Sequence, residues 1–414
     1  MLYILVTAFG DLSLAEITVY LEKNKVKYEV IKSSEHIIIL NAETLNSRDL
    51  IKKSGGLYKI GEIKCVLKDK EIRDEIIIKK KLDNYKFYNW ISDKAKWCIS
   101  TYADRNNDIS ELQTILEEYF KERIESDGVR NAKYIFQNKF KGFEQEIISD
   151  IILKKGIIIN GFEILLVKMS ENYFIGNTLE VIDNNEFIKR DLGRPVQDSR
   201  ISISPKMARI LVNLTGLNSN GKILDPFCGI GTILQEAAIL GLDIYGSDID
   251  KNRVAESVRN MKWLSLNYNL MLKNISDKFF SIDVCQLSSK FNIKVDGIVT
   301  EPILLPPLKN YPEEDESKNM LLKSSLIYEN AIREIAKVLK RGCRLILVVP
   351  QIITKNKSKI SLSLEEVFLE NSLRVYQPSM ITLKYPLIPT PKRDQKILRC
   401  VYVLEKIDVS SEPY

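Results

Sequence analysis

Short apolar runs alternate with helix-like stretches over the first 190 residues of this 414-residue chain. Their spacing and their β-branched and aromatic residues predict strands at 3–6, 28–31 and 37–40 and helices at 13–24 and 47–55. The next stretch repeats this style, with strands expected at 86–91, 96–100, 160–168 and 172–181, the last two as a hairpin, and a helix at 109–126. We therefore predict two α+β modules, residues 1–65 and 66–190.

The pattern changes after residue 190. The sequence Arg-Asp-Leu-Gly-Arg-Pro at 190–195 is polar and contains glycine and proline, so residues 191–203 are predicted to be a linker. A helix is expected next, because Ser204 can cap it and Pro205 suits its first turn. Strands and helices then alternate as in a parallel sheet, with strands predicted at 222–224, 243–246, 278–282, 297–300 and 344–349.

The final predicted strands, 374–382 and 397–405, are joined by a loop rich in proline and lysine, which suits an antiparallel pair. We expect residues 204–414 to form a Rossmann-like α/β domain whose parallel sheet is closed by this hairpin. The acidic stretch 312–317 is expected to be a surface loop.

Composition narrows the possible functions. No apolar run approaches the roughly 20 residues of a membrane span, and the apolar N-terminus is predicted to be a strand rather than a signal peptide, so we expect a cytoplasmic protein without membrane association. The six cysteines show no C-x-x-C spacing, and there is one histidine, His36, which argues against a metal site and against histidine-activated nucleophiles. The net charge is +6, and Lys and Arg are dense between residues 52 and 194, where a polyanion can dock.

Residues 225–232, Asp-Pro-Phe-Cys-Gly-Ile-Gly-Thr, follow a predicted buried strand and lead into a helix. Gly229 and Gly231 allow backbone amides to approach a negatively charged ligand group at the helix N-terminus. A dinucleotide-binding loop requires a small residue at the third glycine position, which is Leu234 here, so nicotinamide chemistry is disfavoured. The loop therefore favours another nucleotide-type cofactor.

Asp248 ends the next predicted strand, about 20 residues after the glycine loop, where a carboxylate can accept hydrogen bonds from both ribose hydroxyls. This spacing supports an adenosyl ligand. The alternative, that Asp248 only caps the following helix, is weaker because Asp250 is the better cap candidate. Asp283 ends the third strand and is a candidate for the adenine amino group.

The fourth predicted strand leads into Glu301 and Pro302. An exocyclic base nitrogen is a weak nucleophile because its lone pair is delocalised into the ring. The Glu301 carboxylate and the Pro302 carbonyl can accept its N–H groups and orient the lone pair, which needs no metal. The alternative is a proline-rich turn with a solvated glutamate.

These motifs, together with Ser-Pro-Lys-Met-Ala-Arg at 204–209, resemble the THUMP-containing RNA methyltransferases, especially the archaeal and eukaryotic enzymes that form N2-methylguanosine at tRNA position 10. The resemblance is specific over about residues 172–305. It implies a ferredoxin-like domain at 1–65, a THUMP-like RNA-binding domain at 66–190 and a class I methyltransferase domain at 204–414. It further implies S-adenosyl-L-methionine as cofactor, with these candidate ligands: Pro205, Asp225, Phe227, Gly229, Gly231, Thr232, Asp248 and Asp283.

One departure from the family concerns the loop after the fourth strand. The family has Asp-Pro-Pro-Tyr there, and its aromatic ring stacks on the flipped base, whereas this chain has Glu-Pro-Ile-Leu at 301–304. Stacking is worth roughly 1–3 kcal/mol per base. Loss of the ring should therefore weaken binding of the base unless another ring, such as Tyr311, substitutes for it. The candidate catalytic residues are Glu301, Pro302 and Leu304.

The leading hypothesis is methylation of guanine N2 in tRNA at or near position 10, with the N-terminal modules binding the RNA. Two alternatives stay open. One is an RNA-binding homologue that has lost catalysis, and the other is an N6-adenine methyltransferase. A small activating protein subunit is compatible with both enzyme hypotheses, the guanine-N2 and the N6-adenine methyltransferase.

Overall fold

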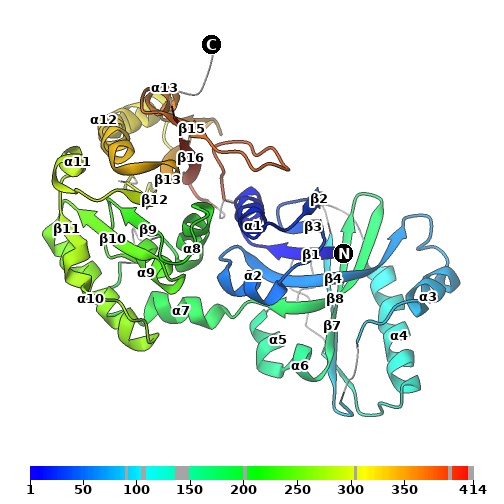
Figure 1. Ribbon diagram of the computed structural model, residues 1–414. Coiled ribbons are helices and arrows are strands. Elements are labelled where there is room, and N and C mark those ends of the chain that lie inside the picture. Colours follow the sequence, from blue (N-terminus) through cyan, green and yellow to red (C-terminus); the bar gives the residue numbers. More distant parts are fainter. Residues whose placement is uncertain are drawn as a thin grey trace. The chain divides into compact units, whose positions relative to one another are not determined.

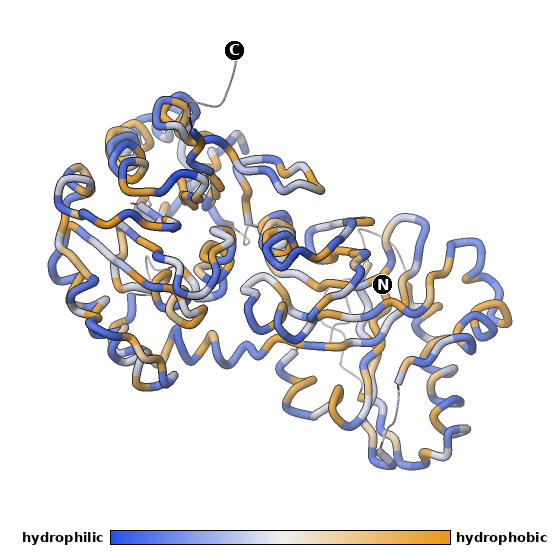
Figure 2. The backbone as a smooth tube through the Cα atoms, in the orientation of Figure 1, coloured by the Kyte–Doolittle hydropathy of each residue, from blue (hydrophilic) through white to orange (hydrophobic). Residues whose placement is uncertain are grey.

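The computed structural model describes residues 1–88, 92–103, 109–135, 149–198, 203–302, 305–389 and 394–408. The chain divides into two compact units (Figure 1). The first comprises residues 1–10, 25–52 and 57–186, and the second comprises residues 11–24, 53–56 and 187–414. Along the backbone, apolar and polar segments alternate within both units, as amphipathic elements require (Figure 2).

The first unit contains one mixed sheet with the strand order β2-β3-β1-β4-β8-β7-β5-β6. Pairing is antiparallel from β2 to β7, and β5 is parallel to both β7 and β6. The strands are β1 (Leu2–Thr7), β2 (Tyr28–Ser33), β3 (Ile37–Ala42), β4 (Leu57–Lys68), β5 (Lys96–Ala103), β6 (Lys133–Tyr134), β7 (Phe162–Met169) and β8 (Asn172–Val181).

In the described part of this unit, the helices that accompany the sheet are α2 (Ser47–Lys53), α3 (Glu75–Asp83), α4 (Ser110–Ser126), α5 (Ser149–Lys155) and α6 (Ile157–Asn160). A core of buried aromatic and aliphatic residues joins α3 and α4 to β5 and β7, with Trp97 and Phe162 stacked and Phe120 against both. Burial of this apolar stripe is what holds short helices on a sheet.

Most strands and helices expected in this half are confirmed, with two exceptions. Strand β4 was not expected, and the boundary proposed between residues 65 and 66 falls inside it. Of the expected strand 86–91, residues 86–88 are irregular and the others lie outside the described residues. Strands from both proposed modules share one sheet, and the subdivision at 1–65 and 66–190 stays a prediction.

The second unit contains a sheet with the order β11-β10-β9-β12-β13-β16-β15, with β14 paired to β13. Strands β11, β10, β9, β12 and β13 are parallel, and β16 is antiparallel to both β13 and β15. The expected parallel sheet closed by an antiparallel pair is confirmed, although the strand expected at 374–382 covers only residues 373–375. The strands are β9 (Lys222–Asp225), β10 (Asp243–Asp248), β11 (Phe279–Ser281), β12 (Val295–Thr300), β13 (Leu339–Ile353), β14 (Lys359–Ser361), β15 (Leu373–Val375) and β16 (Ile397–Lys406).

Helices cover both faces of this second sheet (Figure 1). One group comprises α8 (Pro205–Leu214), α9 (Thr232–Ile239) and α10 (Lys251–Asn267), and the other comprises α11 (Leu287–Lys290), α12 (Glu314–Val338) and α13 (Glu365–Glu370). The second group packs with the sheet in one large apolar cluster. Helix α8 begins as expected, because the Ser204 hydroxyl accepts a hydrogen bond from the amide of Met207 and Pro205 occupies the first turn.

The acidic stretch 312–317 is helical from residue 314, so the expectation of a loop was wrong for most of it. Helix α12 begins at Glu314, with Asp315 and Glu316 also in its first turn. Carboxylates are favourable there because the helix N-terminus carries partial positive charge. Helix α7 (Asn184–Leu192) likewise extends into the region expected to be a linker.

Helix α1 (Asp11–Lys23) belongs to the second unit although its flanking strands belong to the first. Its Glu16 carboxylate is 1% exposed and accepts hydrogen bonds from the Ser54 hydroxyl, the amides of Gly55 and Gly56, and the Asn213 side chain of α8. Burial raises the pKa of Glu16, and these four donors oppose the rise. Among the described residues, no helix combines the length and apolarity needed to cross a bilayer.

Candidate active site

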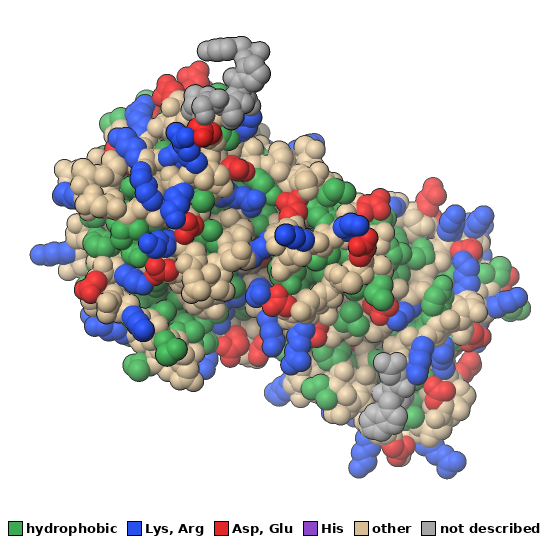
Figure 3. Space-filling model, in the orientation of Figure 1, with side chains coloured by type: hydrophobic (Ala, Val, Ile, Leu, Met, Phe, Trp, Pro, Cys, Tyr) green, Lys and Arg blue, Asp and Glu red, His purple; other side chains and the backbone are tan. Residues whose placement is uncertain are grey.

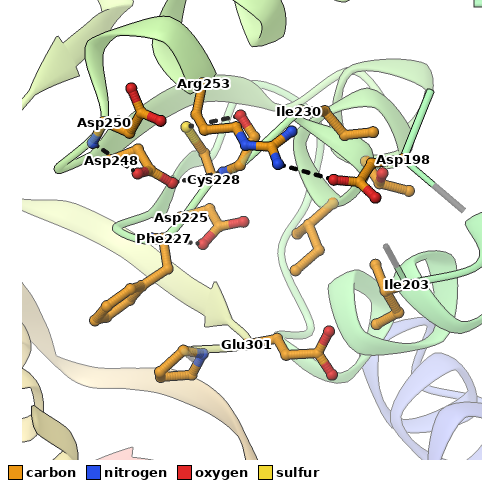
Figure 4. A pocket seen from close by; sticks show the side chains of 14 residues that line it. Asp198, Ile203, Asp225, Phe227, Cys228, Ile230, Asp248, Asp250, Arg253 and Glu301 are labelled. Carbon is orange, nitrogen blue, oxygen red and sulfur yellow. Dashed lines mark hydrogen bonds and ion pairs between the residues drawn. The ribbon is translucent and has the colours of Figure 1, made fainter. Parts of the chain in front are cut away.

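A pocket of about 380 Å³ lies at the carboxyl ends of β9, β10 and β12 in the second unit (Figure 4). Strand ends at such a sheet edge are where open α/β folds bind ligands. The pocket is lined by Asp198, Ile203, Asp225, Phe227, Cys228, Gly229, Ile230, Thr232, Ile233, Asp248, Asp250, Arg253, Glu301 and Pro302. Five carboxylates and one guanidinium therefore surround the space, which favours a ligand carrying positive charge.

Asp225 ends β9 and is 1% exposed. One oxygen of its carboxylate, Oδ1, accepts hydrogen bonds from the Thr300 hydroxyl (2.8 Å) and from the amide of Phe227 (3.1 Å). Burial raises the pKa of Asp225 to about 7, and the negative charges of Asp248 and Glu301 act in the same direction. This carboxyl group therefore exchanges its proton near neutral pH.

The glycine loop is held in place by the next strand end. The Asp248 carboxylate accepts hydrogen bonds from the amides of Gly229 and Asp250, each at 3.0 Å. Gly229 and Gly231 have φ of +50° and +88°, a region that favours glycine. Asp250 caps α10 by accepting from the amide of Asn252, so the cap and the proposed ribose carboxylate are different residues, as expected.

Two charged residues line the pocket without having been expected from the sequence. Asp198 and Arg253 form an ion pair with an N–O distance of 2.8 Å, and Arg253 also contacts Glu256. In Figure 4 this pair closes the side of the pocket next to Ile230 and Ile203. The two residues are separated by 55 positions, and no local motif signals their contact.

Glu301 lies across the pocket from Asp248 and Asp250, with Asp225 between them in the view of Figure 4. Its side chain is 10% exposed and is paired with Arg399 of β16 through distances of 2.5 Å (Nε–Oε1) and 3.4 Å (Nη2–Oε2). Burial raises the pKa of Glu301, and the charge and hydrogen bonds of Arg399 oppose the rise. The expected alternative of a solvated glutamate does not fit this burial.

The pocket thus unites Asp225, Phe227, Gly229, Thr232, Asp248, Glu301 and Pro302 from the expected set. Pro205, Gly231 and Asp283 do not line it. Gly231 instead packs beside Ser257, and Asp283 caps a short 3-10 helix at Val284–Gln286. Leu304 lies outside the described residues. Tyr311, the expected substitute ring, contacts the ammonium groups of Lys357 and Lys396 instead of the pocket.

Comparison with known proteins agrees with this architecture. Residues 194–358 match a family described as an RMKL-like methyltransferase domain. The matched residues all lie within the second unit. The chain is 33% identical over 165 residues to the tRNA (guanine(10)-N2)-dimethyltransferase of Methanocaldococcus jannaschii, covering 38% of this chain and 46% of the relative. It is 43% identical over 101 residues to the enzyme of the same name from Methanothermobacter thermautotrophicus, covering 24% and 27%.

These matches therefore span about half or less of the two relatives. Across the whole chain, the fold is similar to that of TrmN from Thermus thermophilus, with a TM-score of 0.55, 15% identity, and coverage of 98% of this chain and 100% of that structure. At that identity the likeness concerns the fold alone. The expected fold class, with a Rossmann-like methyltransferase sheet in the C-terminal half, is confirmed, and the domain bounds 204–414 stay a prediction.

Proposed function

We propose that the chain is an S-adenosylmethionine-dependent tRNA methyltransferase that modifies the N2 amino group of a guanine at or near position 10. The observation that carries the proposal is one pocket in which the glycine loop with Asp248 faces Glu301 and Pro302. The relatives named as tRNA (guanine(10)-N2)-dimethyltransferases support the substrate.

The pocket residues fit this cofactor. Its volume of about 380 Å³ falls within the roughly 300–1,000 Å³ of small-molecule sites. S-adenosylmethionine carries a sulfonium and an ammonium charge, which suits a pocket lined by five carboxylates and one arginine. Asp248 is the proposed ribose ligand, and the loop from Asp225 to Thr232 is proposed to hold the methionine part.

The cofactor supplies an electrophilic methyl group, and the protein contributes positioning. Glu301 and the Pro302 carbonyl are proposed to accept the two N–H groups of the guanine amino group. This directs the nitrogen lone pair toward the methyl carbon, and the carboxylate stabilises the positive charge that develops on that nitrogen. The buried apolar side chains of Ile203 and Ile230 line the same pocket.

RNA binding is proposed to involve basic side chains distributed over the molecule. On the face shown in Figure 3, Lys and Arg are scattered over both units and interspersed with Asp and Glu. Phosphate contacts by such residues predict an affinity for tRNA that falls steeply with salt concentration.

The test is methyl transfer from tritiated S-adenosylmethionine to a tRNA transcript with guanosine at position 10, followed by nucleoside mass spectrometry. We expect N2-methylguanosine, and no product when position 10 is adenosine. Glu301→Ala is expected to lower the rate by about 10²–10³-fold. A matched control is Glu313→Ala, which removes an exposed carboxylate paired with Lys355 and leaves the rate unchanged.

Two outcomes would contradict the proposal. Cofactor binding without transfer to any tRNA would indicate an RNA-binding homologue that has lost catalysis, an alternative favoured by the absence of Tyr311 from the pocket lining. N6-methyladenosine as the product would indicate the other alternative, because the same two acceptors suit an adenine amino group.

A further inference from the structure

The partner of Glu301 comes from the far end of the chain. Glu301 follows β12, and Arg399 is 98 residues away on β16, two strands farther along the sheet order. Two nitrogens of the Arg399 guanidinium donate hydrogen bonds to the carboxylate, Nε to Oε1 and Nη2 to Oε2. Such a two-point contact fixes the orientation of a carboxylate as well as its charge.

The charges around Glu301 explain why this contact matters. Among the described residues, three titratable groups interact electrostatically with Glu301: Arg399 from β16, Tyr328 from α12 and Asp225 from β9. Tyr328 is fully buried, and its pKa is raised by burial and further by the charge of Glu301. Asp225 is a second carboxyl group. Of these three groups, Arg399 is therefore the one whose positive charge opposes the rise that burial causes in the pKa of Glu301.

A protonated Glu301 would offer the acceptor base a hydroxyl group at one of its oxygens. An ionised carboxylate is an acceptor only, with about four lone-pair positions. Arg399 occupies two of these positions, one on each oxygen, and leaves the others available. The ion pair is therefore compatible with a simultaneous hydrogen bond from an amino group in the pocket.

We propose that Arg399 is a positioning residue for methyl transfer, which holds Glu301 as an oriented carboxylate so that its remaining lone pairs receive an N–H of the acceptor amino group. This inference rests on the proposed function. A residue that only held β16 against the loop after β12 would stabilise the fold but would not set the pH range of activity. The pH dependence of activity therefore distinguishes a positioning role from a purely structural one.

The first experiment measures kcat against pH for Arg399→Gln, with cofactor and tRNA saturating. Losing the cation raises the pKa of Glu301, so activity should disappear at a higher pH as the solution is acidified. We expect the acidic limb to move up by about one pH unit or more, equivalent to a tenfold change in the ionisation equilibrium. The Kd for cofactor should stay within about threefold of wild type, because Arg399 does not line the pocket.

Two further variants sharpen this test. Arg399→Lys keeps the charge but not the two-point contact, so it should lower kcat while leaving the acidic limb near its wild-type position. Arg341→Gln removes an exposed arginine that pairs with Asp408 and should leave the profile unchanged. An equal loss of activity by Arg399→Gln at every pH, with the limb unmoved, would overturn the proposal.

A second measurement does not depend on activity. In protein labelled with ¹³C at the glutamate side-chain carboxyl, the signal lost in Glu301→Gln identifies Glu301, and its titration should shift upward in Arg399→Gln. An unshifted titration in an enzyme that methylates tRNA overturns the role of Arg399 alone. Absence of methyl transfer by the wild-type protein overturns the proposed function, and the positioning role of Arg399 falls with it.

Discussion

The two sides of the pocket are built in different ways. On the proposed cofactor side, Asp248 is held by the backbone amides of Asp250 and Gly229, which are 2 and 19 residues away. On the proposed acceptor side, Glu301 is held by a side chain 98 residues away. The first arrangement is encoded in a short motif, whereas the second depends on the closing of the whole sheet. A local motif therefore identifies a binding loop more reliably than it identifies the residues that tune a reactive group.

Between the two sides of the pocket, the largest expected difference is in the effect of a substitution on cofactor affinity. Asp248→Ala removes the acceptor of two amide hydrogen bonds and the proposed ribose ligand. Hydrogen bonds to a charged group are worth about 1.5–3 kcal/mol each, so the Kd for S-adenosylmethionine should rise by about 10- to 100-fold. Isothermal titration calorimetry measures this change.

The matched control is Asp243→Asn at the opposite end of β10, where the carboxylate pairs with Lys278 outside the pocket. It should leave the Kd unchanged, and Glu301→Gln should change it by less than about threefold. If Glu301→Gln weakened cofactor binding as much as Asp248→Ala does, the two sides of the pocket would not act separately, and the comparison between them would fail.

A smaller effect should distinguish the two glycines of the cofactor loop. A Cβ at Gly231 would lie 2.4 Å from the Ser257 hydroxyl oxygen and 3.1 Å from a carbon of Met261, whereas a Cβ at Gly229 would meet nothing within 4 Å. Both residues have positive φ, so alanine at either position is strained. Gly231→Ala should therefore destabilise the fold by about 1–3 kcal/mol more than Gly229→Ala.

Urea unfolding of the two glycine variants measures that difference, with circular dichroism as the signal. Equal unfolding free energies would mean that α10 moves away from the loop without cost. In that case the loop would be less tightly scaffolded than the short distances to Ser257 and Met261 indicate.

The sequence predicted those parts of the fold that depend on near neighbours. The caps of α8 and α10 were identified from Ser204 and Asp250, and the parallel strands from their apolar runs. Strand β4 was missed because Lys59 interrupts its apolar pattern. That lysine is fully buried and paired with Glu163 at 2.8 Å, and Glu163 is 104 residues away.

Glu301 and Pro302 were predicted from the sequence, whereas helix α12 and the long-range partners of the pocket residues were missed for related reasons. The acidic start of α12 resembles a solvated loop until the buried stripe that follows, including Tyr328 and Ile335, is placed on the sheet. The contacts Asp198–Arg253 and Glu301–Arg399 join residues 55 and 98 positions apart. Spacing along the chain carries no information about such pairs, and only the folded sheet brings them together.

The smallest expected effect concerns a hydrogen bond between two neighbouring strand ends, from the Thr300 hydroxyl at the end of β12 to Asp225 at the end of β9. Because the pKa of Asp225 is raised from 3.8 to about 7, the folded protein retains a proton there that the unfolded chain has lost. The contribution of Asp225 to stability therefore falls as pH rises through that window. Thr300 favours the ionised form, so Thr300→Val should raise this pKa further.

The cost of Thr300→Val should accordingly depend on pH. At pH 8 the ionised Asp225 loses a donor, and we expect a destabilisation of about 1–2 kcal/mol. At pH 5 the carboxyl group is largely protonated, and the cost should be less than half as large. Urea unfolding at both pH values measures this difference, and Thr300→Ser, which keeps the hydroxyl, serves as the control. A loss of unfolding free energy that is the same at both pH values would show that the Thr300 hydroxyl acts through packing alone and not through the charge of Asp225.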